Sequence, residues 1–288
     1  MIATSQRFIS YELGKGNLHK LKDVFCTTLT IHIAIAFIIV VLSEVIGVWF
    51  LNTKLNIPSD RMMAANWTLQ LSIFVFAVNV ISVPYNASIV AHEKMSAFAY
   101  ISIFEVSLKL AIAYLLLFIS YDKLIVYSIL VFCVALLLRS LYCFYCKRHF
   151  EECHYTFSFN IEQFREMFAF AGWSLVGNLG FSFKDQLSNI LLNLFFGTVV
   201  NAARGISVQV GSLINSFSAN FMMAMNPQIT KSYAVGDLYR SKELVYAGCR
   251  FSFYLLAVIS LPIMINITYI LNLWLVEVPQ YTDIFLIL

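Results

Sequence analysis

The chain has 288 residues, of which 60% are hydrophobic and only 12% are charged, and its formal net charge is +3. Soluble domains usually hold about a quarter charged residues, so this composition excludes an ordinary soluble protein and favours a membrane protein. Because no run of lysine and arginine exceeds two residues, we expect no nucleic-acid partner.

Apolar segments long enough to cross a bilayer recur along the chain. A spanning helix needs about 20 mostly apolar residues. The sequence predicts seven such helices, at 24–50, 65–91, 97–119, 124–146, 168–196, 203–225 and 247–275. An eighth is expected to begin near Tyr281, with only its start inside the chain. Since the alternation typical of barrel strands is lacking, we expect an all-α polytopic membrane protein.

Lysine and arginine residues are unevenly distributed between the two sets of predicted loops. The loops 1–23, 92–96, 147–167 and 226–246 hold eleven of them, and the opposite loops hold three, Lys54, Arg61 and Lys123. Basic residues concentrate in cytoplasmic loops. We therefore expect the first set of loops, including the N-terminal end, to lie in the cytoplasm.

Two segments, "ATSQRFISYELGKGNLHK" at 3–20 and "NPQITKSYAVGDLYRSKE" at 226–243, share five identities at one offset of 222 residues. Six predicted helices separate them, so both would lie on the same side, as in a repeat with a period of six helices. Equivalent halves would need about two more helices before Met1 and about three after Leu288. We therefore expect an internal piece of a 12-helix protein, with an N-terminal bundle at 1–158 that lacks its first two helices and a C-terminal bundle at 159–288 that lacks its last ones.

The predicted helix 168–196 carries a polar stripe. Its members recur every three or four residues and are Ser174, Asn178, Ser182, Asp185, Asn189 and Asn193. This spacing places them on one helical face, with Lys184 beside it. Such a face either hydrogen-bonds to a neighbouring helix or lines a wet cavity.

The predicted helix 203–225 continues this pattern with Arg204 and Asn215. The short turn 197–202 makes the two helices antiparallel neighbours, so their polar faces can meet. We therefore expect a substrate cavity, with Asp185 orienting Lys184, although Arg204 could instead reach the outer headgroups. Its predicted lining residues are Lys184, Arg204, Asp185, Asn178, Asn189 and Asn215.

A second charged group lies in the predicted helix 97–119, where Glu105 precedes Lys109 by four residues. This order favours an ion pair within the helix. The pair is expected to act either as a structural lock that faces protein or as a proton or ion relay. Asn79, Ser82 and Asn86 share one face of the helix 65–91, and Pro84 is expected to kink it.

No pattern in the chain indicates catalysis or a bound cofactor. Cys143, Cys146 and Cys153 with His149 and His154 only crudely resemble a zinc site, because a second CxxC pair is lacking. The loops contain no paired carboxylates, glycine-rich phosphate loop or nucleophile arrangement. We therefore expect no enzyme, no metal and no cofactor.

Three stretches resemble a known family: "VPYNASIVAHEKMSAFAYISIFEVSLKL" at 83–110, "FAGWSLVGNLGFSFKDQLSNILLNLFFG" at 170–197 and "NAARGISVQVGSLINSFSANFMMAMNPQITKSYAVGD" at 201–237. These stretches are similar in sequence to bacterial polysaccharide (O-antigen-type) repeat-unit flippases of the MATE-like exporter superfamily. The resemblance implies a 12-helix fold of two six-helix bundles around a central cavity. It implies transport of undecaprenyl-pyrophosphate-linked oligosaccharide across the bacterial inner membrane, with membrane lipids and polysaccharide polymerase machinery as partners. The first two helices, which form part of that cavity in the family, would be missing here.

Three functions remain open from the sequence. A flippase needs cations for pyrophosphate and amides or hydroxyls for sugars, as the helices within 168–225 provide. A cation-coupled multidrug exporter of the same fold would use acidic residues such as Asp185 and Glu105, and Lys184 and Arg204 argue against it. A membrane-embedded transferase would need a catalytic constellation that the sequence does not show.

Overall fold

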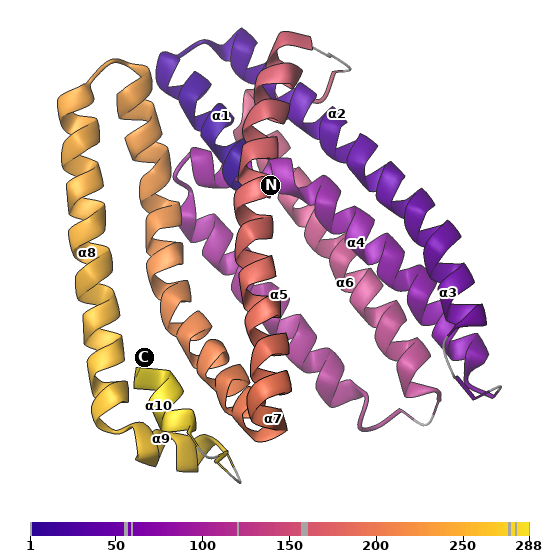
Figure 1. The fold of residues 1–288 in the computed structure, drawn as a ribbon. Coiled ribbons are helices and arrows are strands. Elements are labelled where there is room, and N and C mark those ends of the chain that lie inside the picture. Colours follow the sequence, from indigo (N-terminus) through magenta and orange to yellow (C-terminus); the bar gives the residue numbers. More distant parts are fainter. Residues whose placement is uncertain are drawn as a thin grey trace. The chain divides into compact units, whose positions relative to one another are not determined.

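The protein is described by a computed structural model that covers residues 2–54, 57–58, 60–119, 121–156, 161–275, 278–279 and 281–287 (Figure 1). Helices account for 90% of it, and these residues contain no strand, which confirms the all-α class. The chain forms two compact units, Met1–Met167 and Phe168–Leu288. The helices are α1 (Ile2–Lys15), α2 (Leu18–Leu42), the π-helix η1 (Ser43–Gly47), α3 (Val48–Thr53), α4 (Met62–Ala91), α5 (Met95–Leu115), α6 (Lys123–His149), the 3₁₀ helix η2 (Glu151–Cys153), α7 (Ile161–Ala234), α8 (Leu238–Ile265), α9 (Ile267–Trp274) and α10 (Thr282–Ile287).

Within the described residues, five helical segments are long and apolar enough to cross a membrane: Leu18–Thr53, Met62–Ala91, Met95–Leu115, Lys123–His149 and Leu238–Ile265. The chain is therefore a multi-pass membrane protein. The segments 168–196 and 203–225, which the sequence also predicts to span, both lie in α7. They are not among the five, because their polar stripes lower the mean hydropathy.

The first unit is built around α4, which packs against α6, α2 and α1. Its core joins Phe25 of α2 to Tyr85 of α4, whose ring centroids lie 5.3 Å apart in an edge-to-face arrangement. Ala87 and Ala91 of α4 are fully buried in the same core. Small residues allow helices to approach closely, and close packing drives helix association inside a bilayer.

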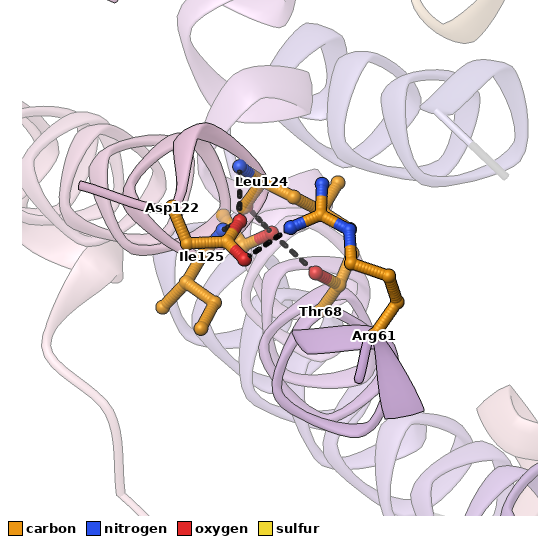
Figure 2. A network of polar contacts seen from close by, with 6 residues as sticks. Arg61, Thr68, Asp122, Leu124 and Ile125 are labelled. Atoms are coloured by element: carbon orange, nitrogen blue, oxygen red, sulfur yellow. Dashed lines mark hydrogen bonds and ion pairs between the residues drawn. The ribbon is translucent and has the colours of Figure 1, made fainter. Parts of the chain in front are cut away.

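A polar network ties the start of α4 to the start of α6, as Figure 2 shows. Asp122 caps α6 by accepting a hydrogen bond from the Leu124 amide at 3.0 Å, and its second oxygen lies 2.6 Å from Nη1 of Arg61, which precedes α4. One turn further along, the Ser128 hydroxyl lies 3.1 Å from the Thr68 hydroxyl. The two helix ends are thus held together by side chains and not only by apolar contact.

The long helix α7 consists of two legs that meet at Gly197, where the backbone leaves the helical region with φ 79° and ψ −173° (Figure 1, red to orange). A residue with a side chain is strongly disfavoured in this conformation, so the bend depends on glycine. The bend lies at the start of the predicted turn 197–202, and it makes the two legs neighbours within the second unit.

The turns before α2 and before α8 share one construction, a glycine with positive φ followed by a residue that caps the next helix. Gly16 and Gly236 both have positive φ, 70° and 82°, and each amide donates to the carbonyl three residues earlier. Asn17 and Asp237 then cap the next helix. The capping positions differ by 220 residues, whereas the five identities differ by 222 and pair Gly236 with Gly14, so the two turns do not match in the register of the identities.

The start of the predicted junction between halves packs onto the first unit. His92 Nε2 lies 2.5 Å from Glu152 Oε1, and the His92 ring stacks on Phe150 with centroids 3.9 Å apart. Tyr155 and Thr30 are joined by a hydroxyl contact of 3.1 Å. The part of the junction at 157–160 lies outside the described residues.

Candidate functional site

Arg204 is the centre of a polar cluster in the second unit. Its Nη1 donates to Asn189 Oδ1 at 2.6 Å and to the Asp185 carbonyl at 3.3 Å, while its Nη2 lies 3.7 Å from Asp185 Oδ1. The Arg204 side chain is only 14% exposed, and that of Asp185 is 55% exposed. The bend at Gly197 produces this cluster, because it brings the first turns of the second leg against the end of the first leg.

Lys184 lies outside the Arg204 cluster and is exposed. Its Nζ is 6.0 Å from the centroid of the Phe181 ring, at the outer limit of a cation–π contact. Asp185 therefore pairs with Arg204 and does not orient Lys184 as expected from the sequence. The physical reason is that adjacent residues of a helix point about 100° apart and do not face each other.

The remaining predicted cavity residues, Asn178 and Asn215, are exposed on the two legs of α7. Among the residues that the structure describes, no hydrogen bond links either of them to the Arg204 cluster. The structure thus brings together three of the six residues, namely Arg204, Asp185 and Asn189.

The first unit holds the second predicted group. Lys109 Nζ lies 2.5 Å from Glu105 Oε1, one turn earlier on α5. The Lys109 side chain is 57% exposed in the chain and that of Glu105 is 32% exposed. Glu105 also lines a cavity of about 340 Å³ that is formed by residues of α1, α4, α5 and α6. The pair therefore has its carboxylate at the cavity and its ammonium group on the more exposed side.

A third charged residue, Arg139 of α6, lines the same cavity. Its Nη1 donates to the Ile81 carbonyl at 3.0 Å, in the turn of α4 before Pro84, and its guanidinium carbon lies 4.1 Å from the Tyr85 ring centroid. Arg139 is absent from the residues that the polar stripes predict. The sequence could have identified Arg139 as a cavity residue, because a lone cation inside an apolar span usually faces a protein interior or a wet cavity.

Cys146 and His149, near the end of α6, contact two different backbone carbonyls. Cys146 Sγ contacts the Tyr85 carbonyl at 3.4 Å, and His149 Nδ1 contacts the Tyr145 carbonyl at 3.0 Å. Within the described ranges, no group of three or more His, Cys, Asp or Glu residues could hold a metal ion.

No protein-family model, no curated protein and no solved structure matches this chain.

Proposed function

We propose that this protein is a transporter that flips undecaprenyl-pyrophosphate-linked oligosaccharide across the bacterial inner membrane. The observation that carries the proposal is the Arg204 cluster, a largely buried guanidinium held by Asn189 and Asp185 within a multi-pass membrane protein. Charged groups inside membrane-embedded helices are costly and mark substrate or ion pathways.

The chemistry of the Arg204 cluster suits an anionic head group. A guanidinium has five donors in a planar fork and can hold phosphate oxygens with two parallel bonds. The weak 3.7 Å contact with Asp185 leaves room for exchange, since an arriving phosphate can replace that carboxylate. Lys184 then serves as a separate point charge, and Asn178, Asn189 and Asn215 supply amide groups for sugar hydroxyls.

The architecture that goes with this proposal is a 12-helix protein of two six-helix bundles of MATE-like type. This chain then supplies seven spanning helices and the start of an eighth, with its first residues in the cytoplasm. The two bundles rock so that the cavity opens to each side in turn, while the acyl chain stays in the lipid. Polysaccharide polymerase machinery receives the flipped product.

The proposal is tested by flipping of fluorescent lipid-linked oligosaccharide in vesicles that contain the purified protein. Arg204→Gln should slow flipping about tenfold or more, because a charge-assisted contact to phosphate is lost. Arg250→Gln, a change to an exposed arginine of α8, is the matched control and should have little effect. Equal flipping by the parent and the Arg204 variant would overturn the assignment of Arg204.

A cation-coupled multidrug exporter is the second candidate, because the carboxylate of Glu105 lines the cavity of the first unit together with Tyr142. Arg139 in the same cavity opposes a cationic substrate. Efflux of a cationic dye from the same vesicles separates the two functions: dye efflux that needs Glu105, without flipping of lipid-linked sugar, would replace the flippase proposal.

A further inference from the structure

The cavity in the first unit has a mixed polar lining that is separate from the Arg204 cluster. It is partly open and has a volume of about 340 Å³, and its polar lining comes from Asn79, Ser82 and Asn86 of α4, Glu105 of α5, and Arg139 and Tyr142 of α6. Small-molecule sites in proteins begin at about 300 Å³. The cavity is therefore large enough for one small polar molecule.

Among the described residues around the cavity, one positive charge has no carboxylate partner. Glu105 is neutralised by Lys109 at 2.5 Å. Arg139 contacts only neutral groups, the Ile81 carbonyl and the face of Tyr85, and no ion pair of Arg139 occurs between described residues. Since an unpaired charge away from water is unfavourable, the cavity favours a ligand with a single negative charge.

The neutral groups of the lining add acceptors for hydroxyl hydrogens. Asn86 Oδ1 is buried and has no hydrogen-bond partner in the described part of the chain. Ser82 donates its hydroxyl hydrogen to the Val78 carbonyl at 2.9 Å, so its oxygen is left to accept. A ligand that satisfies these oxygens carries hydrogen-bond donors beside its negative charge, and hydroxyl groups can supply them.

We propose that this cavity binds one carboxylated sugar unit, a hexuronate, with its carboxylate on Arg139 and a hydroxyl group on Asn86 Oδ1. A single carboxylate matches Arg139, the one cation without a carboxylate partner among the described lining residues, and a hexose ring with its hydroxyls matches both the volume and the acceptors. Inorganic phosphate would fill little of the cavity, and pyrophosphate would bring more negative charge than Arg139 alone balances. The inference rests on the proposed function where it names the cargo, a lipid-linked oligosaccharide that contains an acidic sugar.

The test is direct binding of glucuronate to the purified chain in detergent by isothermal titration calorimetry. Glucuronate should bind at least about tenfold more tightly than glucose, because glucose lacks the charged contact. Arg139→Gln should abolish that preference, and Arg139→Lys should retain part of it. Arg148→Gln on the same helix, where the side chain is exposed, should bind glucuronate like the parent.

A second variant separates binding from folding. Asn86→Val should weaken glucuronate binding without lowering the thermal unfolding midpoint, since Asn86 Oδ1 has no described partner to lose. A preference for glucuronate that survives in Arg139→Gln would overturn the proposal, and so would tighter Arg139-dependent binding of pyrophosphate. Binding of glucuronate by a protein that flips no lipid-linked sugar would uphold the site and reject the transport function, so the two failures are distinguishable.

Discussion

At the scale of single residues, a buried carboxylate lies where α6 ends and η2 begins. Glu152 is only 3% exposed, and its carboxylate is matched by His92 at 2.5 Å. Removal of His92 would leave this buried carboxylate without that partner. The sequence does not predict this pair, because its members are 60 residues apart and neither belongs to a periodic stripe.

Cys153, next to Glu152, should react slowly with alkylating reagents. Its hydrogen bond with Cys146 and its burial raise the pKa of the Cys153 thiol above its ordinary value. The thiolate is the reactive form, so at pH 7.5 iodoacetamide should label Cys153 only after unfolding. Mass spectrometry of peptides from native and denatured protein measures this difference, and rapid labelling of the native protein would contradict the burial of the thiol.

The raised pKa of the Cys153 thiol also determines how the free energy of unfolding changes with pH. A thiol with a raised pKa in the folded state contributes stability that is complete below the pKa of the unfolded thiol, about 8.5, and is lost as the pH rises above that value. The parent protein should therefore lose unfolding free energy at alkaline pH more steeply than Cys153→Ala, which has no thiol to ionise. Parallel pH profiles for the two proteins would count against the raised pKa.

At the scale of elements, the bend of α7 decides where the Arg204 cluster forms. Gly197→Ala should cost about 1–3 kcal/mol of stability, because alanine is strained at the φ and ψ of this residue. Gly205→Ala is the matched control, since a Cβ at Gly205 meets nothing within 4 Å and its backbone is helical. That change should be neutral or stabilise by up to about 1 kcal/mol. Unfolding in a denaturing detergent titration gives both values, and equal effects would refute the role of the bend.

The four spanning helices of the first unit were predictable from hydropathy, whereas α1 (Ile2–Lys15) lies in the segment 1–23 that was predicted to be a loop. The predicted spans 24–50, 65–91, 97–119 and 124–146 coincide with the described helical segments to within about six residues at each end. Periodicity could not show where α7 bends within the turn 197–202, because only the backbone angles single out Gly197. The sequence could not predict the partner of Asp185 either. Lys184 is its neighbour in the sequence, whereas Arg204 becomes its neighbour in space only because α7 bends.

At the scale of the whole molecule, the similar turns before α2 and before α8 predict that both turns lie on the same side of the membrane. His19 and Tyr239 are exposed residues just after the two turns, and six predicted helices separate them. Cysteines placed at these positions, in a background without other cysteines, should react with a membrane-impermeant maleimide from the same side of the vesicle. A cysteine at Lys54 should react from the opposite side. Labelling of His19→Cys and Tyr239→Cys from opposite sides would rule out the six-helix repeat.

The site in the first unit shows what a sequence can and cannot reveal about a whole protein. The stripe of Asn79, Ser82 and Asn86 and the pair at Glu105 are visible from spacing on their own helices. Their convergence on one cavity with Arg139 depends on how α4, α5 and α6 pack, which periodicity does not encode. The sequence of a single helix thus indicates its polar face, whereas only the tertiary packing shows which polar faces line the same cavity.

The π-helix η1 has a consequence for how this chain is compared with any other. Its wider turn, Ser43–Gly47, carries Glu44, which accepts a hydrogen bond from Gln70 at 2.8 Å. A π-turn adds one residue without adding a turn, so every side chain beyond it is out of phase by about 100° with a continuous α-helix. An alignment of this span with a regular helix therefore needs a one-residue gap within 43–47, and without that gap Trp49 and Leu51 would be matched to the wrong face.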